Sequence, residues 1–198
     1  YVFTKGVTST PAELALGKNG KEQRLLTALN ENWMGSRAFA SVEERWVTSK
    51  ADGERIRAWI AYPPDFDAAK KYPLLLEIHG GPHTNFGARF SAEGQLYAAA
   101  GDVVVYANPR GSTSYGERFA NLIHHNYPSE DYDDLMSVVD ELTSESYIDS
   151  DRLFVTGGSG GGVLTAWIVG KTDRFRAAVV AKPVINWVSK VLTADSYI

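Results

Sequence analysis

Cysteine is absent from this sequence of 198 residues, and its absence excludes several kinds of chemistry at once. Without a thiol there is no disulfide, no thiolate nucleophile and no zinc site built from cysteine ligands. A cysteine-free chain fits the cytoplasm, which is the compartment that we expect. The sequence opens on Tyr1 inside a strand-like pattern, with neither an initiator Met nor a signal peptide. This opening predicts a chain cut from a longer one, whose targeting information is missing.

Long apolar runs and an excess of basic residues are also missing. The formal net charge is −4 at pH 7, from 20 Lys and Arg against 24 Asp and Glu. No apolar run reaches the length that a membrane span requires. A domain that binds nucleic acid or an anionic membrane surface usually carries a basic patch. We therefore expect neither nucleic acid nor membrane as a partner.

Histidine is scarce, and all four histidines lie in the earlier part of the chain, at His79, His83, His124 and His125. The pair at 124–125 precedes an acidic segment, but its spacing matches no metal-ligand motif, and a polar loop before a helix is the better interpretation. His79 follows an apolar run, and we expect a hydrogen-bonded histidine in a glycine-rich turn rather than a base. The sequence predicts no metal and no cofactor.

The strongest functional signal lies at residues 153–167. A β-branched apolar run meets Gly157-Gly158-Ser159-Gly160-Gly161, and an apolar run typical of a helix follows at once. This order is what a nucleophile elbow requires, because the serine must sit at a sharp, strained turn between a strand and a helix. The helix start would also direct free backbone N–H groups toward an oxyanion. A structural turn and a flexible linker are the alternatives, and the lack of a polar spacer disfavours the linker.

Apolar runs on either side of this elbow predict the fold. Strand-like runs occur at 74–78, 103–106, 153–156 and 177–181, and helical patterns separate them at 91–100, from 129 onward and at 163–170. A hairpin pattern, 44–50 and 55–62 around Asp52-Gly53, precedes them. Alternating strands and helices predict an α/β-hydrolase fold, a mostly parallel sheet with helices on both faces, cut off after the strand that follows the elbow.

Residues 1–38 have a different pattern. Short strand-like segments are separated by turn residues at 9–11 and 17–20, and so few short strands cannot bury a core alone. We expect residues 1–38 to be the end of a larger β array plus a connector. Residues 39–198 then form the beginning of the α/β unit.

Three motifs occur in order along the chain: His79-Gly80-Gly81-Pro82-His83, the segment 108–116 that begins Asn-Pro-Arg-Gly-Ser, and the glycine-rich serine box. Together they resemble the prolyl oligopeptidase family of serine peptidases (S9), particularly its acylaminoacyl-peptidase and dipeptidyl-peptidase-like branch. The resemblance implies that residues 1–38 end a β-propeller and that 39–198 begin the catalytic domain. It implies a peptidase that hydrolyses short peptides through an acyl-enzyme, and it leaves open a homo-oligomer of the intact protein.

The resemblance also implies roles for individual residues. Ser159 would be the nucleophile, and the backbone N–H groups of Gly81 and Gly160 would form the oxyanion hole. The family often has Tyr after the serine, so Gly160 keeps the backbone donor without a Tyr side chain. Trp187, at the end of the run Pro183-Val184-Ile185-Asn186-Trp187, would form a wall of the pocket for the substrate side chain.

The family order places the triad acid and base after the serine, where this sequence has no histidine. The later acids, Asp173 and Asp195, do not match the position of the family's triad acid. We therefore expect this chain alone to lack two of three catalytic groups and to be inactive. An esterase or lipase, or a catalytically dead scaffold, is the alternative. The propeller-like start favours the peptidase, and a scaffold that ended here would leave a sheet edge uncovered.

Overall fold

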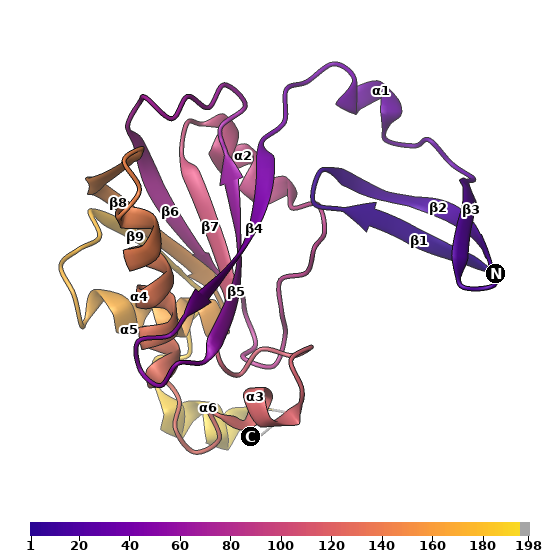
Figure 1. Cartoon of the computed structure of the whole chain (residues 1–198). Helices are drawn as coiled ribbons and strands as arrows, with labels where there is room; N and C mark the ends of the chain where they lie inside the picture. The colour runs from indigo at the N-terminus through magenta and orange to yellow at the C-terminus, as the bar shows by residue number, and fades with distance from the viewer. Residues whose placement is uncertain (195–198) are drawn as a thin grey trace.

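The computed structural model describes residues 1–194 and contains two separate β-sheets (Figure 1). The smaller sheet is antiparallel, with the strands β1 (Val2–Val7), β2 (Thr10–Lys18) and β3 (Lys21–Leu25). The short helix α1 (Glu31–Met34) follows and leads to the larger unit. Ala15 is buried, but Val2 and Leu25 are half exposed, so this sheet has little core of its own. Its origin in a propeller stays a prediction.

The larger sheet has six strands in the order β4-β5-β7-β6-β8-β9. Their bounds are β4 Ser41–Thr48, β5 Arg55–Tyr62, β6 Tyr72–Ile78, β7 Val103–Asn108, β8 Ile148–Gly158 and β9 Ala177–Ala181. The first three strands in this order pair antiparallel, and β7, β6, β8 and β9 pair parallel. The prediction of an α/β-hydrolase sheet, preceded by an antiparallel hairpin, is confirmed.

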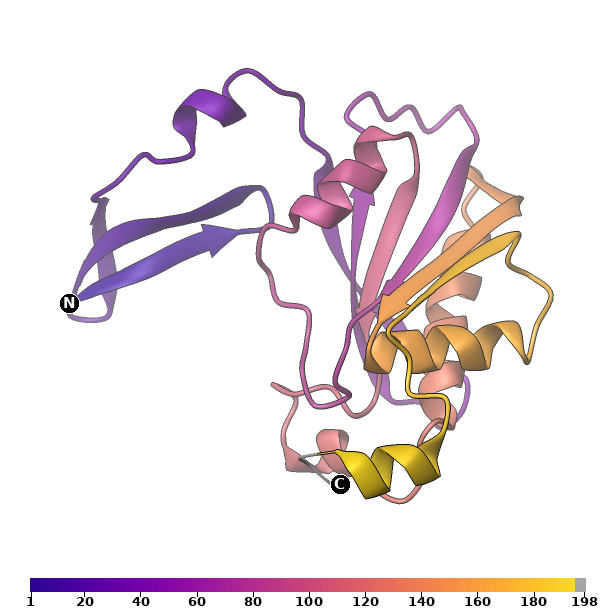
Figure 2. The same ribbon diagram turned by 180° about the vertical axis from the view of Figure 1, so that it is seen from behind.

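Helices cover both faces of the larger sheet. α2 (Ala92–Ala99) lies on one face, and α4 (Glu130–Thr143) and α5 (Gly160–Val169) lie on the other. Two shorter helices, α3 (Glu117–Asn121) and α6 (Trp187–Thr193), lie beyond the end of the sheet (Figure 1). The chain moves one way along the sheet from β6 to β7 and the other way from β7 to β8, so right-handed crossovers place α2 on one face and α4 on the other. Figure 2 shows α2 in front of the sheet.

Side chains of the central strands alternate between two cores. From β6, Leu74 and Leu76 point toward α4 and α5, where they pack with Leu135 and Ile168. The opposite face packs Trp59, Val104 and Tyr106 against Ala98 of α2 in a smaller cluster. This alternation leaves the carboxyl ends of the parallel strands between two packed layers, which is where α/β sheets carry their sites.

Strand β9 differs from the expectation of a buried strand. Val179 is 63% exposed and Val180 is 38% exposed. α2 covers β5 and β7, so in the part that the structure describes no helix covers Val179 on the α2 face of β9. Val180 alternates onto the face of α5 and is partly exposed because β9 is the edge strand. Among residues 1–194, no helix is long and apolar enough to cross a membrane.

Candidate active site

Ser159 lies at the turn between β8 and α5 with an unusual backbone conformation. Its φ is 59° and its ψ is −117°, a region that residues other than glycine rarely adopt. The turn is fixed on both sides, because Ser159 N–H donates to Ala181 O over 2.9 Å and Ser159 O accepts from Val163 N–H over 3.0 Å. The side chain is exposed. The predicted order of strand, serine turn and helix is confirmed.

The glycines after Ser159 are required because neighbouring backbone passes very close to them. A Cβ atom at Gly160 would lie 2.7 Å from Gly81 O, and one at Gly161 would lie 2.1 Å from Ile78 O. At Gly162 the obstacle would be Ala181 O, at 2.3 Å. The first turn of α5 thus lies tightly between two segments, residues 78–81 and the end of β9, so a side chain at these positions would require neighbouring backbone to move.

The predicted oxyanion donors lie beside the serine. A Cβ atom on Gly80 would be 4.0 Å from Ser159 Oγ, and a Cβ atom on Gly160 would be 3.0 Å from Gly81 N. Gly160 is the first residue of α5, where backbone N–H groups have no intrahelical acceptor. Within residues 1–194, no acceptor is found for Gly81 N–H either. The structure therefore brings Ser159, Gly81 and Gly160 together, and their catalytic roles stay predictions.

The segment after β7 holds this arrangement in place through several side chains. The amide of Asn108 accepts from Phe86 N–H over 2.8 Å and donates to Phe86 O over 2.9 Å, which ties the loop after Gly81 to β7. Ser112 Oγ lies 2.9 Å from His79 Nε2, so the same segment also contacts the beginning of that loop. The segment 108–116, which contributed to the family resemblance, therefore holds the loop that contains Gly81 in place.

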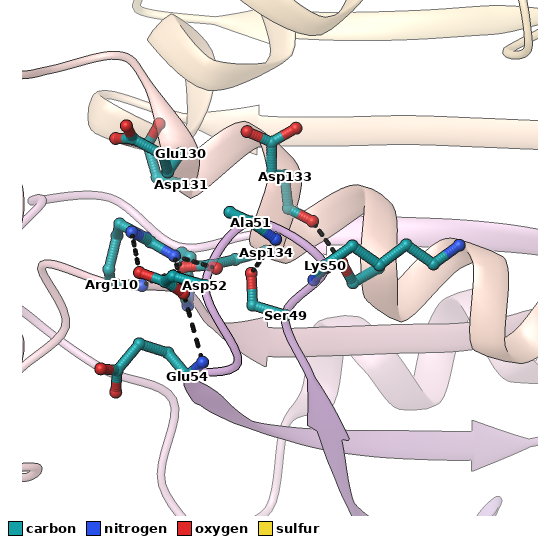
Figure 3. A network of polar contacts seen from close by, with 12 residues as sticks. Ser49, Lys50, Ala51, Asp52, Glu54, Arg110, Glu130, Asp131, Asp133 and Asp134 are labelled. Atoms are coloured by element: carbon teal, nitrogen blue, oxygen red, sulfur yellow. Dashed lines mark hydrogen bonds and ion pairs between the residues drawn. The ribbon is translucent and has the colours of Figure 1, made fainter.

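Arg110, in the same segment, forms a buried ion pair (Figure 3). Its guanidinium donates to both carboxylate oxygens of Asp134 over 2.8 and 2.9 Å, and its backbone N–H donates to Asp134 as well. The same guanidinium donates to both oxygens of Asp52 over 3.0 Å. Hydrogen bonding to Arg110 lowers the pKa of Asp52. Arg110 thus joins the hairpin of β4 and β5 to α4, and its role is structural.

A cavity of about 470 Å³ opens beside Ser159, at the ends of β6, β8 and β9. Its polar lining includes His79, Lys182, Glu93 and Glu77. Glu77 is only 9% exposed, and within the described residues its Oε2 has no hydrogen-bond partner. Burial, with a smaller effect from the charge of Glu93, raises the pKa of Glu77 to about 7. The cavity therefore holds a carboxyl group that keeps its proton to a higher pH than an ordinary glutamate does.

We expect the stability of this chain to fall as the pH rises from 4.5 to 7, in part because of Glu77. In that window the folded state keeps the proton on Glu77 and the unfolded state, with the ordinary pKa of 4.5, has released it. Glu77→Gln should remove this component, which amounts to at most about 3 kcal/mol of unfolding free energy. Urea denaturation at pH 5 and pH 8 measures it, and Glu93→Gln is the matched control, expected to have a small effect. An unchanged pH dependence in Glu77→Gln would contradict the assignment.

Trp187 is placed by the beginning of α6. It is the first residue of α6 rather than part of a loop, because the Asn186 side chain caps that helix by accepting from Ser189 N–H over 2.9 Å. Among residues 1–194, Trp187 does not line the cavity beside Ser159. Its ring packs edge-on against Tyr127, with 6.1 Å between the ring centres. The role of Trp187 in specificity stays a prediction.

Tyr127 is a residue of this site that the sequence did not indicate. Its hydroxyl donates to Gly160 O over 3.1 Å, and burial raises the pKa of the phenol. The ring thereby connects Trp187 to Gly160, the residue that follows Ser159. No local signal could have revealed this, because the partners are 33 residues apart and an isolated tyrosine in a polar loop has no distinctive pattern.

The remaining candidates do not assemble around Ser159. Asp173 precedes the amino end of β9, whereas Ser159 follows the carboxyl end of β8. Because β8 and β9 are parallel, the two residues lie at opposite ends of these strands. Asp195 falls outside the described residues. The rings of His124 and His125 lie 3.9 Å apart, and among residues 1–194 no group of three His, Asp or Glu side chains is arranged to hold a metal ion.

The sheet order and the serine turn define an α/β-hydrolase. The family model of the prolyl oligopeptidase family matches residues 88–198, more than half of the sequence. The chain belongs to this family.

Individual relatives agree with this assignment. An uncharacterized peptidase, YuxL, of Bacillus subtilis is 47% identical over 135 residues, which are 68% of this chain and 20% of that protein. Dipeptidyl-peptidase 5 of Aspergillus fumigatus is 38% identical over 129 residues, 63% of this chain and 18% of that protein. The solved acylaminoacyl peptidase of Pyrococcus horikoshii superposes with a TM-score of 0.90 at 30% identity, over 98% of this chain and 31% of that one. The chain thus spans between about a fifth and a third of the length of these relatives.

Proposed function

We propose that the protein containing this chain is a serine peptidase that cleaves short peptides through an acyl-enzyme on Ser159. The observation that carries the proposal is the strained, exposed Ser159 at the start of α5, with the backbone of Gly81 and Gly160 beside it. A serine in this position is accessible to a carbonyl carbon, and free N–H groups beside it can stabilise the oxyanion that forms there.

In the proposed reaction, Ser159 Oγ bonds to the carbonyl carbon of the scissile peptide and its proton passes to a general base. The C–N bond then breaks, the leaving amine takes up that proton, and water releases the acyl group in the same way. Among residues 1–194, no histidine is hydrogen-bonded to Ser159. We propose that the triad acid and base belong to other parts of a longer protein, as the length of the relatives suggests.

A fluorophosphonate probe tests the proposal on the complete protein. The expected result is a single labelled peptide containing Ser159, and no label in Ser159→Ala. Hydrolysis of matched peptide p-nitroanilides and alkyl esters distinguishes a peptidase from an esterase, because only the peptidase should cleave the amide efficiently. Label on another serine, in protein that hydrolyses peptides, would contradict the proposal.

We further propose that Trp187 selects apolar side chains next to the scissile bond. One solved acylaminoacyl peptidase is in complex with Z-Gly-Gly-Phe-chloromethyl ketone, a ligand that presents Phe at its reactive end. The large flat face of an indole suits such a side chain. Trp187→Ala should lower kcat/KM for substrates with Phe or Leu by about 10- to 200-fold, which corresponds to about 1 to 3 kcal/mol of transition-state binding. Substrates with Ala should be spared.

The control for this prediction is Trp46→Ala. Trp46 lies on β4 and is 42% exposed, close to the 45% of Trp187, but it is remote from the serine turn. We expect it to leave the ratio of kcat/KM between Phe and Ala substrates unchanged. An equal loss on all substrates in Trp187→Ala, together with a lower melting temperature, would assign Trp187 to structural packing.

A further inference from the structure

His79 is held by hydrogen bonds at both nitrogens of its ring. Nδ1 lies 2.6 Å from the carbonyl oxygen of Gly80, and Nε2 lies 2.9 Å from Ser112 Oγ. The edge of the ring contacts Phe86, with the ring planes at 77°. Both nitrogens are occupied by groups other than Ser159, so the imidazole is not placed to act as the base for that serine.

The partners of the ring determine where its proton lies. A carbonyl oxygen can only accept, so Nδ1 must carry hydrogen. Burial lowers the pKa of His79, which keeps the ring neutral near pH 7 and leaves Nε2 as an acceptor. Ser112 Oγ lies 2.9 Å from Nε2 and donates to Pro109 O over 2.6 Å, so its single hydrogen cannot serve both acceptors. Ser112 is 1% exposed and fixes the position of the Nε2 side of the ring, and the carbonyl of Gly80 places hydrogen on Nδ1.

The bond from Nδ1–H reaches the peptide that carries a predicted oxyanion donor. Gly80 O and Gly81 N–H belong to one planar trans peptide, so they point in opposite directions. When the oxygen is directed at His79, the N–H is directed away from it. A Cβ atom on Gly80 would be 3.4 Å from Ser159 Cβ, which places this peptide beside the serine.

This peptide needs an external restraint. Both of its residues are glycines, which lack the steric preferences that hold other peptides in one orientation. Gly81 has a φ of +116°, a conformation that only glycine adopts readily. Without a partner for Gly80 O, rotation of the peptide plane would cost little, and the N–H would lose its direction.

We propose that His79 is a positioning residue that holds the Gly80–Gly81 peptide with its N–H toward the oxyanion. The inference rests on the proposed function. What it adds to that function is a positioning role for His79, whose side chain does not contact the substrate. In this arrangement, loss of the His79 contact affects the step in which charge develops and leaves substrate binding nearly intact.

Two substitutions of His79 separate this role from a general structural one. Asn places its amide nitrogen near the position of Nδ1, and Gln places it near the position of Nε2. His79→Asn therefore retains a donor for Gly80 O and loses the contact with Ser112, whereas His79→Gln does the reverse. The two variants remove the same ring and differ in the contact that the proposal requires.

In the complete protein, His79→Gln should lower kcat by about 10²- to 10³-fold with little change in KM, as for loss of an oxyanion donor. His79→Asn should stay within about tenfold of wild type. The affinity of a peptidyl boronate, which mimics the tetrahedral state, should fall in parallel with kcat/KM across the variants. Equal activity of the two variants, or losses that appear in KM alone, would overturn the proposal.

A crystal structure of the complete His79→Gln protein gives a readout that does not depend on activity. The expected result is a rotated Gly80–Gly81 peptide, with Gly81 N–H turned away from Ser159. An unrotated peptide would overturn the proposal even if kcat falls. If wild type takes no fluorophosphonate label, the proposed function fails, and this structure still decides whether His79 orients the peptide.

Discussion

In the complete protein, Ser159→Ala should lower kcat by about 10⁶-fold. Loss of a triad nucleophile typically has this effect, and the activity that remains comes from substrate binding and the oxyanion donors. Ser159 is exposed at the strained turn, and Ala fits that site without new contacts, so the fold should persist. The measurement is kcat for a peptide p-nitroanilide in wild type and variant, with circular dichroism to verify folding.

Ser137→Ala is a control for the removal of a serine hydroxyl. Ser137 is buried in α4, away from the cavity beside Ser159, where its hydroxyl donates to Asp133 O and accepts from Lys50 N–H. We expect this variant to lose some stability and to keep its kcat. A Ser159→Ala protein that retains more than about 1% of wild-type kcat would show that another group attacks the substrate.

The second large effect should come from Asp134→Ala, which should lower the free energy of unfolding by about 3 to 5 kcal/mol. Its carboxylate is fully buried and pairs with Arg110, which is 4% exposed. Removing Asp134 leaves the buried guanidinium with only the partly exposed Asp52 as a counter-charge, which costs far more than a surface pair contributes. Urea denaturation followed by tryptophan fluorescence measures the change.

Asp52 is the matched control, because it binds the same guanidinium from a partly exposed position. Its side chain is 42% exposed, so solvent can replace it when it is removed. Asp52→Ala should cost no more than about 1 kcal/mol. The double variant Arg110→Met with Asp134→Leu should recover most of the loss, because it removes both charges and restores apolar volume. Equal losses in Asp134→Ala and Asp52→Ala would contradict this account.

Much of the larger sheet was predictable because its strands carry strong local patterns. The alternating run 55–62 coincides with β5, and the apolar run 74–78 falls within β6, Tyr72–Ile78. The serine turn was predictable for the same reason, since glycines on both sides of one serine, placed between two apolar runs, are typical of a nucleophile elbow.

What could not be predicted depends on contacts between distant segments. Val179 and Val180 looked like core residues, since burial depends on which helices cover a strand and not on its own composition. The contact between His79 and Ser112 joins residues 33 positions apart, as does that between Tyr127 and Gly160. Among the residues that line the cavity, Glu77 had a local signal of an unusual environment, because it is the one charged residue of β6.

The exposed edge of β9 has a consequence for biosynthesis. The outer side of an edge strand presents unpaired N–H and C=O groups, which can template the addition of another strand. β9, Ala177–Ala181, is uncharged and has β-branched residues at its centre. A ribosome adds only about 5–20 residues per second, so a nascent chain that has just released β9 exposes this edge for seconds. We expect chaperones that recognise short, extended apolar segments to bind the growing polypeptide at this stage.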